Sequence, residues 1–245
     1  QSVVVTASGE QSNPVTISVT GLNEENTPVI GSVFPEKAKR GGMITIVGNG
    51  FGDDVGVVYF GDDKKLADMD LPPQCSGTDV WTNKSIIVKV PIDIPFGSQP
   101  IRVERISPVA ESAPYPYVIE DGVAGPNLCS IDPDNGPIGI SVLLIGEKFG
   151  DTVGSVEIGG RVAGSGSDWV DEEIKGVLVP SGALTGDVYV FNSASPAGQS
   201  NPITFEVNDC QKNGCSTKSD TCCTTGDKTG SCVADALKCL GDDVP

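Results

Sequence analysis

The chain of 245 residues contains no histidine. This absence excludes the Ser-His-Asp and Cys-His arrangements of nucleophilic catalysis, histidine-ligated metal sites and covalent haem attachment. Aromatic residues make up only 5% of the chain, although a glycan-binding surface is expected to expose several of them. The sequence also has no apolar run near the ~18 residues of a spanning helix. It shows no signal peptide, and if the protein is exported we expect its targeting segment to have been removed.

Basic residues are scarce, with 16 Lys and Arg against 33 Asp and Glu and a formal net charge of −17. A nucleic-acid partner requires a basic footprint, and the longest basic cluster is only residues 37–40. The acidic surface favours solubility and repels anionic membranes. We therefore predict no nucleic-acid partner and no direct membrane insertion.

The carboxylates offer no convincing chemical site. Pairs such as Asp53-Asp54 lie beside expected turns, where solvated acidic residues are ordinary. The segment Asp132-Pro133-Asp134-Asn135-Gly136 resembles a calcium loop, but Pro137 and Leu143 occupy the positions where an EF-hand needs Gly and Glu. We predict no catalytic, cofactor-binding or metal-binding residue, no cofactor, and no enzymatic activity.

What the chain does contain is an internal repeat. The segment Gln11-Ser12-Asn13-Pro14-Val15-Thr16-Ile17 returns as Gln199-Ser200-Asn201-Pro202-Ile203-Thr204-Phe205, with a looser copy at residues 111–117. Upstream, Phe51-Gly52-Asp53 recurs as Phe149-Gly150-Asp151, and Trp81 recurs as Trp169 after the first copy has gained about ten residues. One module of fewer than about 100 residues thus occurs twice in full and once as its final piece, a size that suits a sandwich domain.

Each copy has an all-β pattern. Short runs rich in β-branched residues, such as 43–47, 86–90 and 141–145, alternate with clusters of Gly, Pro, Asn and Asp. The 31 glycines and 18 prolines fit many turns and few helices. A helical apolar stripe appears only at residues 233–237, which is one or two turns at most.

The motifs Gly48-Asn49-Gly50-Phe51-Gly52 and Gly146-Glu147-Lys148-Phe149-Gly150, each followed by a tryptophan and a strand ending in Val-Pro, resemble the IPT/TIG immunoglobulin-like family of bacterial cell-surface type. The resemblance implies tandem early-set immunoglobulin-like β-sandwiches but no single function. We expect a terminal hairpin of a partial repeat at 1–22, sandwiches at 28–119 and 126–207, and a Cys-rich tail at 208–245. Trp81 and Trp169 precede a strand in both copies, which favours core packing over sugar stacking.

Eight cysteines indicate an oxidising compartment. Six crowd a tail with little apolar content, which predicts a disulfide framework of open connectivity: Cys210, Cys215, Cys222, Cys223, Cys232 and Cys239. Zinc is the rival explanation for the tail, but it lacks paired CxxC units and histidine. Cys75 and Cys129 lie outside the tail, and we predict that they bond to each other and fix the angle between the sandwiches. The alternative is that each pairs with the tail or with another chain.

The sequence as a whole predicts an extracellular or cell-surface structural or adhesive protein. It would be a rod of domains serving as a stalk, adhesin or filament subunit, with self-association or neighbouring surface proteins as partners. The alternatives are a non-catalytic glycan-binding accessory region of a secreted polysaccharide-active enzyme, or a receptor ectodomain fragment, which a glycan on Asn83 would favour. For residues 1–22, the end of a longer array is favoured over strand addition to a neighbour or packing on the first sandwich.

Overall fold

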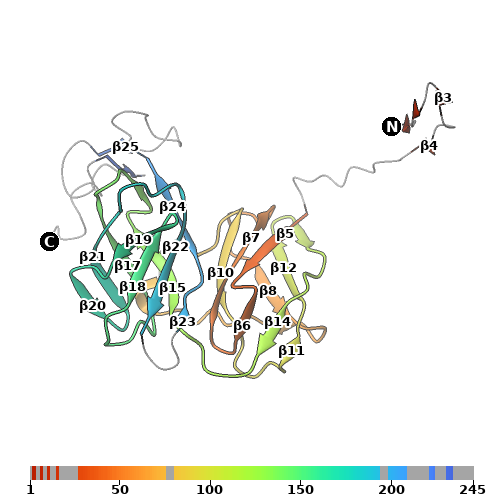
Figure 1. Cartoon of the computed structure of the whole chain (residues 1–245). Coiled ribbons are helices and arrows are strands. Elements are labelled where there is room, and N and C mark those ends of the chain that lie inside the picture. Colours follow the sequence, from red (N-terminus) through yellow and green to blue (C-terminus); the bar gives the residue numbers. More distant parts are fainter. Residues whose placement is uncertain are drawn as a thin grey trace.

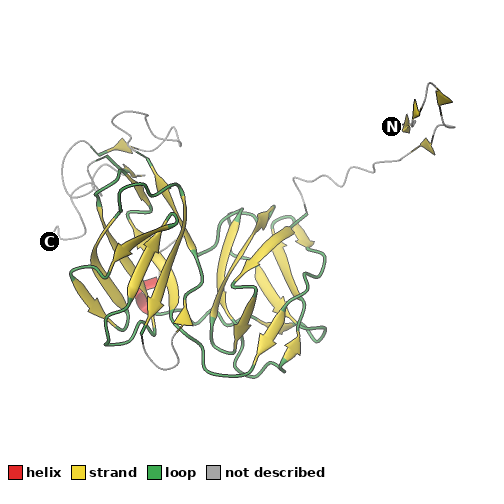
Figure 2. Cartoon of the chain, in the orientation of Figure 1, coloured by secondary structure: helices red, strands yellow, loops and turns green. Residues whose placement is uncertain are grey.

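A computed structural model describes residues 27–75, 80–193 and 198–208, together with short tail pieces at 221–223 and 230–233. Within residues 2–16 it describes only the backbone of four two-residue strands. The described chain is almost entirely β-structure (Figure 2). It contains one helical element, the 3₁₀ turn η1 (Pro73–Cys75), and therefore no described helix of membrane-spanning length.

The first sandwich occupies residues 28–120 and is built from three small sheets (Figure 1). The first sheet has the order β10 (Ser85–Lys89), β7 (Met43–Asn49) and β5 (Val29–Phe34). The second has the order β13 (Val109–Glu111), β12 (Ile101–Ile106), β8 (Val57–Phe60) and β9 (Lys65–Leu66). The third comprises β11 (Gly97–Ser98), β14 (Val118–Glu120) and β6 (Lys37–Lys39), where β14 and β6 run parallel.

The second sandwich begins at β15 and repeats this plan with two sheets. One has the order β15 (Asn127–Asp132), β17 (Ser141–Glu147), β21 (Glu173–Leu178) and β20 (Asp168–Val170). The other has the order β16 (Asn135–Gly136), β24 (Ile203–Val207), β22 (Gly186–Asn192), β18 (Ser155–Ile158) and β19 (Arg161–Gly164), with β23 (Gly198–Gln199) also paired to β22.

Each sandwich has its own apolar core because alternate strand residues point inward. In the first core Val58 and Phe60 of β8 face the sheet of Ile44 and Ile46. In the second, Val156 and Ile158 of β18 occupy the same places. The all-β immunoglobulin-like fold predicted from the sequence is therefore confirmed.

The terminal segments also contain paired strands. Near the start, β1 (Ser2–Val3) pairs with β4 (Val15–Thr16), and β2 (Thr6–Ala7) pairs with β3 (Glu10–Gln11), both antiparallel, as a hairpin requires. In the tail, β25 (Thr221–Cys222) pairs with β26 (Cys232–Val233). Val233 is thus in a strand, whereas the rest of the short helix expected at 233–237 lies outside the described residues.

The tail strand docks on the second sandwich through Asn135. Its Oδ1 accepts a hydrogen bond from the Cys232 amide at 2.7 Å, and its Nδ2 donates to the Cys232 carbonyl at 2.9 Å. Cys222, Cys223 and Cys232 are disulfide-bonded. Cys210, Cys215 and Cys239 lie outside the described residues, so a framework of three tail disulfides stays a prediction.

Candidate functional site

The tryptophans are core residues in both sandwiches, as the repeat predicted. Trp81 is 6% exposed and Trp169 is 9% exposed. Their indole N–H groups donate to the carbonyl oxygens of Gly52 at 3.2 Å and Gly150 at 3.0 Å, so each ring holds the Phe-Gly-Asp turn of its own copy. Neither indole face is free to stack on a sugar.

The calcium-like turn is structural as well. Asn135 and Gly136 form β16, which pairs in parallel with β24 and anchors the tail. Across the described ranges, no three His, Cys, Asp or Glu side chains gather closely enough to hold a metal ion.

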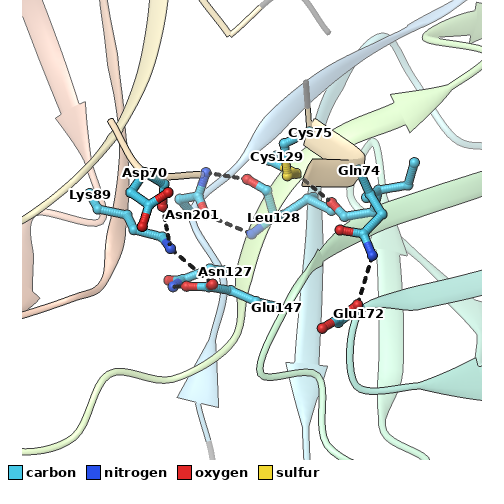
Figure 3. The surroundings of a disulfide bond; sticks show 11 residues. Asp70, Gln74, Cys75, Lys89, Asn127, Leu128, Cys129, Glu147, Glu172 and Asn201 are labelled. Carbon is cyan, nitrogen blue, oxygen red and sulfur yellow. Dashed lines mark hydrogen bonds and ion pairs between the residues drawn. A yellow bond between two sulfur atoms is a disulfide. The ribbon is translucent and has the colours of Figure 1, made fainter. Parts of the chain in front are cut away.

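A disulfide, two buried asparagines and an ion pair lie where the two sandwiches meet, and this contact region is called the joint (Figure 3). Cys75 and Cys129 form a disulfide with Cα atoms 5.8 Å apart and a sequence separation of 54, as the sequence predicted. Cys75 ends η1 in the extra segment of the first copy, and Cys129 lies in β15 of the second. Both are buried.

An apolar cluster surrounds this disulfide and draws on both sandwiches. Met43 and Ile87 of the first sandwich are buried beside the two half-cystines. Ile145 and Ile203 of the second pack against them. The extra segment contributes Leu71, and η1 lies against β17 of the second sandwich (Figure 2).

Asn127 is the first polar connection across the joint. It is 2% exposed, and its Oδ1 accepts a hydrogen bond from the Met43 amide at 2.7 Å. Its Nδ2 donates to the Gly41 carbonyl at 3.2 Å and to Glu147 Oε1 at 2.7 Å. A buried amide is tolerated only when its donors and acceptors are satisfied. Two of the three partners of Asn127, Met43 and Gly41, belong to the first sandwich, so the hydrogen bonds of this side chain connect the two domains.

Asn201 is the second polar connection. It is 1% exposed and binds the backbone of Leu128 twice, accepting from its N–H at 2.9 Å and donating to its carbonyl at 2.8 Å. The remaining amide proton goes to Thr45 Oγ1 of the first sandwich at 3.0 Å. Thr45 in turn donates to the Pro202 carbonyl at 2.7 Å. The repeated Asn-Pro dipeptide thus fastens β7 of one sandwich to the other.

Charged and amide groups close the rim of the joint. Lys89 Nζ lies 2.9 Å from Glu147 Oε2, and both side chains are less than one-fifth exposed. Lys89 also donates to the Asp70 carbonyl at 2.9 Å. Further out, Gln74 donates to Glu172 at 2.8 Å on the exposed surface. Because Glu147 also accepts from Asn127, the ion pair and the buried amide form one network.

The position of these contacts corrects the predicted end-to-end rod. Thr45 and Ile87 lie in the middle of β7 and β10, so the first sandwich presents the face of a sheet, not its tip, to the second. The two sandwiches therefore lie side by side (Figure 1). The extra segment of the first copy makes this possible because it carries Cys75 across to β15.

A small cleft opens between the sandwiches beneath the connecting segment 121–126. Its volume is about 200 Å³, and its lining includes Lys39, Glu120, Asn127 and Gln199. Ligand pockets commonly occupy about 300–1,000 Å³. The cleft is therefore small for an oligosaccharide site, and its buried amides already have protein partners.

Sequence reasoning found the disulfide but missed the joint residues. Asn201 lies in the repeated Gln-Ser-Asn-Pro segment, so the sequence did single this residue out. The repeat indicated a recurring domain, however, and not a contact between domains. Asn127 and Thr45 had no signal, because Asn127 is a lone residue after Pro126 and Leu143 replaces Thr45 in the other copy.

Comparison with known proteins places part of this chain in a family. Residues 28–117 match the IPT/TIG domain family model. A stretch of 91 residues is 37% identical to a cyclomaltodextrin glucanotransferase of Bacillus sp. (strain 1011), covering 36% of this chain and 11% of that enzyme. A second such enzyme, from Niallia circulans, is 38% identical over 88 residues, covering 35% of this chain and 11% of the enzyme.

Among solved structures, the γ-cyclodextrin glucanotransferase of an alkalophilic Bacillus clarkii matches with 19% identity and a TM-score of 0.32, covering 81% of this chain and 28% of that one. The chain spans about a tenth of the length of the two sequence relatives.

Proposed function

Because residues 28–117 form an IPT/TIG domain, we propose that this chain is a non-catalytic, glycan-binding accessory region of a secreted carbohydrate-active protein. The observation that carries the proposal is the 37% identity over 91 residues to a cyclomaltodextrin glucanotransferase. The matching stretch is only 11% of that enzyme, which supports an accessory role over the enzyme's own chemistry. From the sequence, the structural or adhesive role came first and the glycan-binding accessory role was an alternative. The proposal made here exchanges the two.

The features of both sandwiches support a role without catalysis. The two tryptophans pack in the cores, and the buried amides of the joint are satisfied by protein groups. The chain has no histidine, and its cysteines at the joint are bonded to each other. The tryptophans, the buried amides and the two cysteines therefore all serve the folded structure.

The disulfide supports export. Disulfides persist in oxidising compartments and are rare in the cytosol, and a bonded pair buried between two domains is part of the folded structure. On this ground, and from the bonded cysteines of the tail, we propose that the protein functions outside the cell.

The joint favours a second candidate, a structural or adhesive spacer. A disulfide, an apolar cluster and two buried asparagines connect the sandwiches. The connected pair would act as a rigid spacer that holds neighbouring parts of a longer protein, or a neighbouring surface protein, at a fixed angle. This role needs no glycan, and self-association would be one form of it.

Calorimetric titration of the purified chain with maltoheptaose, soluble starch and cellohexaose separates the two candidates. We expect heat of binding for an α-glucan and no release of reducing ends from starch over prolonged incubation. Hydrolysis or transglycosylation by the pure chain would overturn the non-catalytic proposal. Absence of binding to every glycan, with the joint intact by non-reducing peptide mapping, would leave the spacer role in its place.

A further inference from the structure

The outward face of strand β22 carries two neighbouring aromatic rings. Val188 and Val190 point into the second core and are fully buried, so Tyr189 and Phe191 lie on the opposite face of the sheet. Both rings are half-buried. Their centroids are 6.2 Å apart and their planes are tilted by 46°.

The same positions in the first sandwich show that the fold does not need these rings. Ile101 pairs with Phe60 as Val188 pairs with Ile158, which makes Arg102 and Glu104 the counterparts of Tyr189 and Phe191. Arg102 lies 3.6 Å from Asp62 and 3.7 Å from Glu111. The first copy therefore carries ion pairs and one ring, Tyr59 opposite Arg102, on this face, while the second presents two neighbouring rings.

Hydrogen-bonding groups flank the two rings. Glu157 lies directly opposite Tyr189, and Ser155 lies opposite Phe191, where cross-strand side chains share one face. Asp187 precedes them on the same face, and its Oδ2 accepts a hydrogen bond from the Tyr189 hydroxyl at 3.1 Å. Burial, reinforced by Asp187, raises the pKa of Tyr189 to about 12, so the phenol stays protonated and remains a donor at neutral pH.

We propose that Tyr189 and Phe191 form a stacking surface for a neutral α-glucan chain, with Glu157 and Asp187 accepting hydrogen bonds from its hydroxyls. The inference deepens the proposed function and rests on it. The negative face of an aromatic ring attracts the polarised C–H groups of a sugar ring, and two adjacent rings offer places for two adjacent sugars. Rings tilted by 46° follow a curved chain better than a flat one.

Charge and area argue against other occupants. The two carboxylates beside the rings, on a chain of net charge −17, repel nucleic acids and anionic polysaccharides. A second copy of this chain would bring the same carboxylates against these. Two half-buried rings also offer far less area than the roughly 1,200–2,000 Å² buried in stable protein interfaces.

The test exchanges the rings for the side chains that the first sandwich carries at the same positions. The whole chain with Tyr189→Arg and Phe191→Glu is titrated with maltoheptaose beside the wild type. We expect affinity to fall about tenfold or more, because the stacking contribution is lost. The matched control is Tyr59→Ala in the first sandwich, whose ring already has Lys64 Nζ at 5.1 Å, and it should bind as tightly as the wild type.

A footprinting experiment on the wild type guards against a folding defect in the exchanged variant. Hydroxyl-radical labelling with and without maltoheptaose should protect Tyr189 and Phe191, while labelling of Tyr59 stays unchanged. If the wild type binds α-glucan but neither protection nor loss of affinity follows, this site is overturned and the proposed function stands. If the wild type binds cellohexaose but no α-glucan, this site is overturned and the proposed function stands. If it binds no glycan at all, both are overturned. Sedimentation showing a dimer that the exchange abolishes would assign the face to a second copy instead.

Discussion

At the residue scale, Asn201 links the repeat in the sequence to the joint in the structure. Its side chain makes three hydrogen bonds, two to Leu128 in its own sandwich and one to Thr45 in the other. The first copy has Ala113 in the corresponding place of its closing motif. That copy therefore cannot fasten a preceding module through an asparagine at this position.

Removal of the Asn201 amide should therefore weaken the whole protein. In Asn201→Ala the backbone of Leu128 and the Thr45 hydroxyl lose buried partners, and each unsatisfied group costs about 1–3 kcal/mol. We expect the free energy of unfolding in urea to fall by at least about 2 kcal/mol. Asn49→Ala, at an exposed position of β7, is the control and should change stability little. Equal stability of the two variants would show that the hydrogen bonds of Asn201 contribute nothing to folding stability.

Tyr117 gives a second prediction at this scale, in the dependence on pH. The side chain is 2% exposed, and its hydroxyl donates to the Pro35 carbonyl at 2.7 Å. Burial raises the pKa of Tyr117 above its ordinary value near 10. The folded pKa then exceeds the unfolded one, so this contribution to stability is fully present below about pH 10 and is lost as the pH rises further.

The substitution Tyr117→Phe removes both the hydrogen bond and this titration. At pH 8 it should lower the free energy of unfolding by about 1 kcal/mol. Between pH 9 and pH 11 the wild type should lose more stability than the variant, because only the wild type gains a titrating phenol on unfolding. Urea titrations at the three pH values give the comparison, and parallel pH profiles of the two proteins would refute the assignment.

At the element scale, the strands were predictable because side-chain alternation and turn residues are local. The glycine that opens each Gly-x-x-Phe-Gly motif has a simple physical cause. A Cβ on Gly48 would stand 2.0 Å from the Val29 carbonyl oxygen, and one on Gly146 would stand 2.0 Å from that of Asn127. An added Cβ would also meet the ring of the following Phe in each copy, so the motif marks where the first strand approaches its antiparallel neighbour closely, beside a β-bulge.

Contacts between elements of different copies could not be predicted in this way. The roughly ten extra residues before Trp81 are visible as an insertion, but nothing local in them specifies that η1 reaches β17. Likewise, the lone residues Asn127 and Thr45 become partners only when two sheet faces meet. The fold of each copy follows from periodicity, whereas the joint depends on long-range complementarity of single side chains.

This close approach of β15 and β17 supplies a prediction at the element scale. Gly146→Ala forces β17 away from β15, and we expect a loss of at least about 1–3 kcal/mol in unfolding free energy, as overpacking does. Gly186→Ala is the matched control in β22, since its Cβ would meet nothing closer than 3.7 Å. The control should stay near wild-type stability in thermal melts. A Gly146→Ala variant that melts with the control would contradict the explanation by close strand approach.

At the scale of the whole molecule, the side-by-side arrangement couples two domains that each have a complete core. The covalent part of the joint closes a loop of 54 residues, and such a loop contributes about 2–4 kcal/mol in the chain-entropy view. The non-covalent part buries Met43, Ile87 and the asparagines. Either part alone should hold the sandwiches together at neutral pH, which makes their combination testable.

A double-mutant cycle on the disulfide and Asn201 tests this redundancy. The Cys75→Ser, Cys129→Ser protein should unfold about 2–4 kcal/mol more easily yet keep the wild-type radius of gyration in X-ray scattering, because the buried amides and the apolar cluster remain. Asn201→Ala alone should also keep it, held by the disulfide. Only the combined variant should expand in scattering while both sandwiches retain β-type circular dichroism, since each has its own core. If the disulfide-free protein expands while Asn201 is intact, the disulfide alone fixes the angle between the sandwiches. The hydrogen bonds between the sandwiches would then form only because the disulfide holds the two domains together.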